Sequence, residues 1–165
     1  MPIRFNADEV FTVAEQIERN GAAFYRCAAE MQADARAKEM LLVMAAMEEQ
    51  HERVFQGMHS QLTKDEREAV TFDADGELPL YLRALADRTV FDVTSDCAAR
   101  LTGRESVSDV CRMGVSAEKD SVVFYLGMRD LVPGRLGAEK IDAIIKEEMG
   151  HISTLAALAQ RLAGQ

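Results

Sequence analysis

The sequence of 165 residues contains few of the residues that break helices, with only three prolines and ten glycines. Leu, Ala, Met, Glu and Arg recur through most of its length, and all five favour the α-helix. Apolar residues make up 48% of the chain, which excludes a disordered chain and is enough for one compact core. The composition therefore predicts an all-α protein with a single domain, residues 1–165.

Charge and hydropathy exclude two classes of partner. The formal net charge of −9 opposes binding to a nucleic-acid backbone or to an anionic membrane surface. No apolar run approaches the roughly 18 residues needed to cross a bilayer. The N-terminal sequence MPIRFNADEV lacks the apolar core of a secretory signal. We therefore expect a cytoplasmic protein that binds neither nucleic acid nor membrane, and the sequence is compatible with a homodimer.

The three cysteines, Cys27, Cys97 and Cys111, are odd in number and widely spaced, and they form no C-x-x-C pair. This pattern excludes a disulfide framework and predicts reduced thiols. A redox role for one of them stays open.

Apolar residues recur at helical spacing in four long segments, which are expected at 8–32, 34–62, 106–133 and 137–162. Asp8 is a good N-cap for the first segment. Ser106 or Ser108 would cap the third segment, and Pro133-Gly134 would end it, because a helix interior does not tolerate proline.

Residues 63–105, between the second and third helices, have a different character. The turn-forming run T-F-D-A-D-G-E-L-P precedes one short helix expected at 80–90. A connection this long allows the chain to pass from one end of a helical bundle to the other. The expected architecture is therefore two helical hairpins, 8–62 and 106–163, joined by a long crossover, 63–105.

The sequence nearly repeats itself without gaps when it is shifted by 100 positions. The matching segments are Glu18-Arg-Asn-Gly-Ala-Ala-Phe24-Tyr25 with Glu118-Lys-Asp-Ser-Val-Val-Phe124-Tyr125, and Glu48-Glu-Gln-His51 with Glu148-Met-Gly-His151. In each repeat a turn lies midway between the two glutamates. An antiparallel hairpin would then hold both glutamates at one height, about 22 Å from the turn at 1.5 Å per residue. All four glutamates are expected to meet at one level.

The two Glu-x-x-His motifs fall on the apolar faces of their helices. Glu148 and His151 fill the vacant positions of an apolar stripe that runs from Ile141 to Leu162 with the spacing 3, 4, 3, 4, 3, 4. Most glutamates in a helical protein lie on solvated faces, but these positions point inward. The sequence therefore places six polar side chains in the core: Glu18, Glu48, His51, Glu118, Glu148 and His151.

Burying four carboxylates without counter-charge would cost several kcal/mol each, against a total stability of about 5–15 kcal/mol. No Lys or Arg falls at these levels of the four stripes. Two divalent cations would balance the four carboxylates. Two Glu-x-x-His motifs with a lone glutamate on each of the other helices are a specific signal for a di-iron or di-manganese site. We predict two iron ions, with manganese or zinc left open.

The pattern E-x-x-G-x-x-F-Y with E-x-x-H, repeated as E-x-x-S-x-x-F-Y with E-x-x-H, resembles the rubrerythrin and bacterioferritin branch of the ferritin-like superfamily. The resemblance covers the four long helices and not the crossover. It implies a ferritin-like antiparallel four-helix bundle in which Glu48 and Glu148 bridge two iron ions. One glutamate and one histidine would complete each ion: Glu18 with His51, and Glu118 with His151.

The chain departs from rubrerythrin in two respects. It has no C-x-x-C pair, so the iron-sulfur domain is absent, and Ser121 stands where rubrerythrin has an extra glutamate. The ligand set is nearer to the symmetrical bacterioferritin type. No obvious fifth helix follows Leu162, however, as a ferritin-type cage would require.

Tyr25 and Tyr125 lie seven residues after Glu18 and Glu118, two turns along the same face. A buried tyrosine hydroxyl needs a hydrogen-bond partner, and a ligand carboxylate two turns away or across the bundle would serve. An ordinary core tyrosine is the alternative.

Three functions fit such a site. The leading hypothesis is an oxidoreductase whose reduced di-iron pair reacts with peroxide or dioxygen and is re-reduced by a separate electron-donor protein. The second is a ferroxidase that handles iron as its substrate. The third is a non-redox scaffold that binds zinc or manganese.

Overall fold

The structure, a computed structural model, describes residues 6–68, 101–130 and 132–163. The described part of the chain contains helices and no strand. The helices are α1 (Ala7–Glu30), α2 (Ala35–Ser60), α3 (Lys64–Glu68), α5 (Val107–Arg129), a 3-10 turn η2 (Gly134–Leu136) and α6 (Ala138–Ala163). None of the described helices is long and apolar enough to cross a membrane.

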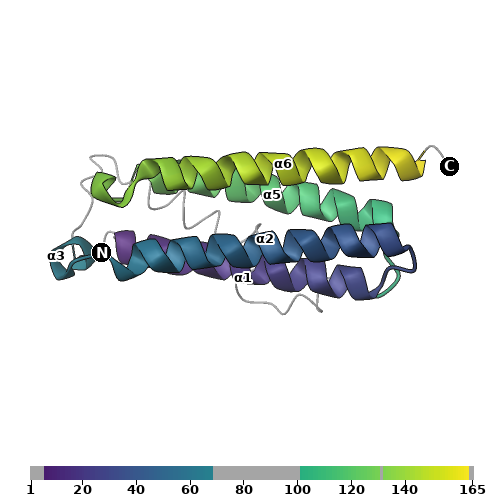
Figure 1. Ribbon diagram of the computed structural model, residues 1–165, viewed down its shortest axis with the longest axis horizontal. Coiled ribbons are helices and arrows are strands. Elements are labelled where there is room, and N and C mark those ends of the chain that lie inside the picture. Colours follow the sequence, from purple (N-terminus) through teal and green to yellow (C-terminus); the bar gives the residue numbers. More distant parts are fainter. Residues whose placement is uncertain (1–5, 69–100, 131, 164–165) are drawn as a thin grey trace, which may run out of the picture.

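The four long helices form an antiparallel bundle of two hairpins (Figure 1). Most helix–helix contacts lie within a hairpin, between α1 and α2 and between α5 and α6. Helix α2 ends at the end of the bundle where α6 begins, whereas α5 begins at the opposite end. The end of α2 and the start of α5 therefore lie at opposite ends of the bundle, which is the arrangement that the predicted crossover requires.

The ends of the long helices are set by local capping. Helix α1 begins at Ala7 because Asn6 and Glu9 form a capping box, in which the Asn6 side chain accepts from the Glu9 amide at 2.9 Å. The prediction of Asp8 as the N-cap was therefore wrong by two residues. Asp34 caps α2, at the position where the second segment was expected to begin, and Ser106, not Ser108, caps α5.

Helix α5 ends at Arg129, four residues before Pro133. A proline disfavours the helical conformation of the residue before it, so the chain leaves the helix early. Residues Gly134–Leu136 then form the 3-10 turn that leads into α6. The expected end at Pro133-Gly134 was therefore a few residues too late.

Within the predicted crossover, the structure describes one short helix, α3, which the sequence did not predict. Arg67 holds it against the first hairpin through the Asp8 carboxylate and the His59 carbonyl oxygen. The short helix expected at 80–90 and the residue Cys97 lie outside the described residues.

Apolar side chains from all four long helices fill the space between the two hairpins. Phe11, Phe55 and Tyr125 form one continuous aromatic layer, with ring centroids 6.5 Å and 5.0 Å apart along the series. Leu41, Ile141 and similar side chains extend the core. These apolar layers lie along the bundle on both sides of a polar level near the middle of each long helix. Water is therefore excluded from that level by packing along the bundle axis.

The register of α2 can be tested with two adjacent leucines. Leu41 is fully buried, whereas Leu42 is 44% exposed. Leu41→Ala should lower the free energy of unfolding by ~2–5 kcal/mol, because it leaves a cavity in the core. Leu42→Ala should change it by no more than ~0.5 kcal/mol. Urea denaturation of the metal-free protein measures both, and equal losses would contradict this register.

Candidate metal centre

One glutamate from each long helix reaches the polar level of the bundle, together with one histidine from α2 and one from α6. All six side chains predicted from the sequence lie there, and none is more than 3% exposed: Glu18, Glu48, His51, Glu118, Glu148 and His151. The level falls near the middle of each helix because each hairpin turns midway between its two glutamates. The structure thus brings together every residue that the sequence proposed as a metal ligand.

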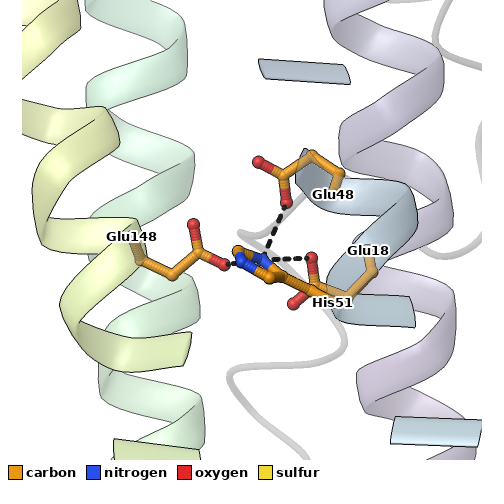
Figure 2. Close-up of side chains that lie close together, drawn as sticks. All are labelled: Glu18, Glu48, His51 and Glu148. Carbon is orange, nitrogen blue, oxygen red and sulfur yellow. Dashed lines mark ion pairs between the residues drawn. The ribbon is translucent and has the colours of Figure 1, made fainter. Parts of the chain in front are cut away.

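The six side chains form two overlapping groups of four, and in each group the potential ligand atoms lie within 4.8 Å of one another. Glu48 and Glu148 belong to both groups. The first group adds Glu18 and His51, which Figure 2 shows facing Glu148 across the space between the hairpins. The second group adds Glu118 and His151.

Each shared carboxylate presents a different oxygen to each histidine. Glu148 Oε1 lies 3.0 Å from His51 Nδ1, and its Oε2 lies 2.9 Å from His151 Nδ1. Glu48 Oε1 lies 3.0 Å from His151 Nδ1, and its Oε2 lies 3.9 Å from His51 Nδ1. A carboxylate placed in this way can bind one ion with each oxygen. This is the bridging geometry that a two-ion site requires.

Glu18 and Glu118 belong to one half of the cluster each. Glu18 Oε2 lies 3.4 Å from His51 Nδ1, and Glu118 Oε1 lies 3.4 Å from His151 Nδ1. The two imidazole rings stack with centroids 5.9 Å apart. The cluster therefore has an approximate twofold symmetry that follows from the sequence repeat.

Many buried nitrogen and oxygen atoms of this cluster have no hydrogen-bond partner. Within the described ranges, seven buried atoms have no partner: Glu18 Oε2, Glu48 Oε1, His51 Nδ1, Glu118 Oε2, both Glu148 oxygens and His151 Nδ1. Both Nδ1 atoms lie close to carboxylate oxygens without forming a hydrogen bond to them. Each unpaired buried group would cost about 1–3 kcal/mol. These potential ligand atoms lie close together without pairing with one another, and such an arrangement is suited to binding metal ions.

Two tyrosines tie the cluster together across the hairpins. The Tyr25 hydroxyl on α1 donates to Glu118 on α5, and the Tyr125 hydroxyl on α5 donates to Glu18 on α1. Burial, followed by the charges of these glutamates, raises the pKa of both hydroxyls well above the usual value. Both hydroxyls therefore keep their protons and act as donors. The sequence left two possible partners for each hydroxyl, a ligand carboxylate two turns away on the same helix or one across the bundle. In the structure the partner is the carboxylate across the bundle.

Gly114 provides the room that Tyr25 needs. A Cβ atom at this position would lie 3.2 Å from the Tyr25 hydroxyl oxygen and 2.8 Å from Leu155 Cδ1. The absence of a side chain thus lets the hydroxyl reach Glu118 one turn further along α5.

The outer nitrogens of the two histidines have different partners. His51 Nε2 lies 2.8 Å from Glu147 Oε2, whereas His151 Nε2 lies 3.4 Å from Met47 Sδ. Glu147 is not among the predicted ligands, and its side chain is 50% exposed. Its contact with His51 was missed. In the sequence, Glu147 stands where the first half has Met47, which is one of several differences between the two halves.

The other glutamates that border the cluster form ion pairs outside it, as expected for solvated residues. The pairs are Glu15 with His59, Glu49 with Arg26, and Glu52 with Arg19. His59, the remaining histidine of the chain, is half-buried and stacks on Phe11 with a centroid distance of 5.5 Å. It stabilises the junction of α1 and α2 and takes no part in the cluster.

Cys27 and Cys111 form no disulfide bond within the described part of the chain. Burial raises the pKa of the Cys111 thiol to about 11, so that it stays protonated near neutral pH and reacts slowly as a nucleophile. This gives no support to a redox role for Cys111.

Crowding of acidic groups perturbs every carboxyl in the cluster. Burial and the charge of Glu148 raise the pKa of Glu118 to about 8 and that of Glu18 above its usual value. The same two causes raise the pKa of Glu48 well above normal. Burial also opposes ionisation of Glu148, but the adjacent His151 and His51 rings outweigh it and lower its pKa to about 2. One shared carboxylate is thus ionised even before a metal binds.

The histidines shift in the opposite direction. Burial lowers the pKa of each ring, but the adjacent carboxylates outweigh it. They raise the pKa of His51 to about 11 and that of His151 to about 9. Near pH 7 the metal-free cluster therefore holds protons on the Nδ1 atoms and on part of the carboxylates.

Comparison with known proteins supports the fold. No family model and no curated protein matches the chain. Among solved structures, the chain is similar to the crystal structure of a candidate ferritin-like diiron-carboxylate protein from Thermotoga maritima. The two chains are 22% identical, and the match covers 95% of this chain and 96% of the other with a TM-score of 0.76. A likeness at this level of identity establishes the ferritin-like fold.

The distinction between shared and unshared glutamates can be tested by metal content. Glu148→Ala should lose both ions, because it removes a ligand from both groups of four. Glu118→Ala should mainly weaken one ion, because it affects one group only. Elemental analysis after desalting gives the number of ions per chain. The same content in both variants and in the wild type would contradict the assigned roles.

Metal binding should release protons, because an Nδ1 atom or a carboxylate must lose its proton before it binds an ion. With raised pKa values at His51, His151 and Glu118, the release should be large at pH 6 and should decrease as the pH rises through these values. Apparent affinity should rise over the same interval. Calorimetry of Zn²⁺ binding in buffers of different ionisation enthalpy counts the protons. Zero release from pH 6 to 8 would show that the cluster is solvated and ionised.

Proposed function

We propose that this chain is a non-haem di-iron oxidoreductase that reduces peroxide or dioxygen with electrons from a separate donor protein. The observation that carries the proposal is the pair of overlapping four-residue groups that share Glu48 and Glu148 in the core. The structural neighbour from Thermotoga maritima, described as of the diiron-carboxylate type, supports the choice of iron. Within the ferritin-like superfamily we place the chain in the rubrerythrin and bacterioferritin branch.

The chemistry of the ligand atoms favours iron or manganese over zinc. Each group of four offers three carboxylates and one imidazole. Hard oxygen donors with one nitrogen suit ions that accept more than four ligands, whereas protein zinc sites are mostly tetrahedral with nitrogen and sulfur ligands. Four carboxylates also balance two divalent ions, which removes the cost of burying them.

When bound, two iron ions that each change by one electron supply the two electrons that cleave the O–O bond of hydrogen peroxide, which takes up two protons to give two waters. The protein residues keep this chemistry in place. Glu48 and Glu148 hold both ions, and the Tyr25 and Tyr125 hydroxyls hold the remaining glutamates. The apolar layers along the bundle exclude water and competing reactions.

The burial of the site supports resident ions over ions that pass through. Each ligand side chain is at most 3% exposed, and the tyrosine hydrogen bonds fix Glu18 and Glu118. A ferroxidase has to release its oxidised product after each cycle. Firmly held ligands suit a catalyst that keeps its ions.

A specific observation favours ferroxidase as the second candidate. Ser121 is buried and donates to the Ala117 carbonyl oxygen at 3.2 Å, where rubrerythrin would have an extra glutamate. The ligand set is therefore the symmetrical one that resembles bacterioferritin.

Rapid mixing of the iron-loaded protein separates the candidates. Protein loaded anaerobically with two ferrous ions per chain is mixed with peroxide or with dioxygen, and oxidation is followed by absorbance. With a chemical reductant in excess, we expect many turnovers at constant protein-bound iron. A ferroxidase would instead consume added free ferrous ion and accumulate ferric product.

Two controls make the result specific. Zn²⁺-loaded protein should show no oxidation, because zinc has no accessible redox change. Glu148→Ala, which loses the ions, should also be inactive. Turnover that persists in either control would contradict the proposed site, and an absence of any oxidation in the iron-loaded wild type would leave only the scaffold hypothesis.

A further inference from the structure

The two halves of the cluster are nearly copies of each other, which makes any difference between them informative. Each half has one unshared glutamate, one histidine, and one tyrosine hydroxyl bound to that glutamate. The Nδ1 distances to the unshared glutamates are equal at 3.4 Å. The distance from Nδ1 to the shared glutamate of the same helix does differ, at 3.9 Å for His51 and 2.9 Å for His151. A chemical difference lies at the outer edge of the histidine rings.

In both rings Nδ1 faces the carboxylates, so Nδ1 is the atom that would bind an ion. A neutral histidine that binds a metal through Nδ1 carries its proton on Nε2. The group that accepts a hydrogen bond from Nε2–H therefore fixes the tautomer and the orientation of the ring, and it makes Nδ1 a stronger donor.

The acceptors in the two halves are chemically unlike. His51 Nε2 has a carboxylate oxygen of Glu147 at 2.8 Å, the distance of a strong charge-assisted hydrogen bond. His151 Nε2 has the thioether sulfur of Met47 at 3.4 Å, and a thioether is a weak acceptor. Positions 47 and 147 correspond in the repeat, so the contrast lies in the residue that each half has at this position.

We propose that Glu147 is a positioning residue that makes the ion position of Glu18 and His51 bind more tightly than that of Glu118 and His151. The inference rests on the di-metal site of the proposed function and goes beyond it by ranking the two ions. Under competition with a chelator, the ion beside His151 is therefore expected to leave first and the ion beside His51 last.

The expected size of the effect follows from the exposure of Glu147. Loss of an acceptor behind a metal-bound histidine typically weakens metal affinity 10- to 100-fold. Because the Glu147 side chain is 50% exposed, water competes for its carboxylate. We therefore expect the low end of that range, about tenfold.

Two variants isolate the ion positions. Glu118→Ala leaves the position beside His51, and Glu18→Ala leaves the position beside His151. They are a matched pair, since each removes one unshared glutamate and frees one tyrosine hydroxyl. Zn²⁺ dissociation constants are measured at one fixed pH by competition with a chromophoric chelator. The ion in Glu118→Ala should bind about tenfold more tightly than the ion in Glu18→Ala.

Glu147→Met, which copies Met47, is then added to each variant. It should weaken Zn²⁺ binding about tenfold in the Glu118→Ala background and leave the Glu18→Ala background unchanged. Met47→Glu in the Glu18→Ala background should tighten binding. Glu147→Gln keeps an acceptor oxygen without the charge, so it should retain more affinity than Glu147→Met. If the two were equally weak, the carboxylate charge and not the hydrogen bond would be responsible, and the positioning role would be overturned.

Failure of this inference is distinguishable from failure of the proposed function. If both half-sites bind Zn²⁺ equally, or if Glu147→Met weakens both, the ranking of the ions is wrong and the di-metal site stands. If neither the wild type nor the variants bind Zn²⁺ at the cluster, the di-metal site fails and the ranking fails with it. Melting temperatures of the metal-free variants confirm that each protein is folded.

Discussion

The concentration of negative charge at one level of the bundle is the constraint on which the rest of the structure depends. Four carboxylates meet where packing excludes water, and the two imidazoles of the same cluster can offset at most half of that charge. A buried charge without a partner costs several kcal/mol, which is a large part of the stability of a domain of this size. The chain tolerates this cost because the same atoms are arranged to share cations. In the metal-free state the repulsion between these carboxylates appears as perturbed pKa values, because bound protons and not metal ions reduce the negative charge.

The geometry of the helical hairpins places the four carboxylates at one level of the bundle. Because each turn lies midway between two glutamates, the antiparallel helices bring both to the same height without any long-range adjustment. The crossed hydrogen bonds of Tyr25 and Tyr125 then join the hairpins at that height. Together with the apolar side chains packed between the hairpins, these hydrogen bonds hold the two halves of the fold against each other.

Much of this could be predicted from the sequence because the signals were periodic. Glu148 and His151 completed an apolar stripe, and the repeat supplied the same register for the first hairpin. Features that depend on contacts between helices far apart in the sequence were harder to predict. Periodicity placed Tyr25 on the inner face, but it did not decide whether its hydroxyl would find a carboxylate on its own hairpin or on the other. The contact between Glu147 and His51 joins α6 to α2 and leaves no trace in either helix alone.

Local errors had local causes. Asp8 is an acceptable N-cap by residue type, but Asn6 forms a capping box with Glu9 and starts the helix earlier. N-cap propensity located the start of the helix to within two residues. The reciprocal hydrogen bonds of the Asn6 and Glu9 side chains determine that Asn6 is the N-cap. The end of α5 was displaced for a comparable reason, since proline acts on the residue before it as well as on its own position.

The approximate twofold axis between Glu48 and Glu148 has a consequence for what the chain can evolve. Two identical hairpins that associated as separate molecules would also bring four glutamates and two histidines to one level. In such a pair every substitution would appear twice, and the two ion positions would have to remain equivalent. Joining both hairpins in one polypeptide removes that restriction. A carboxylate at position 147 can then face a thioether at position 47, and a symmetric scaffold can hold two ions with different tasks.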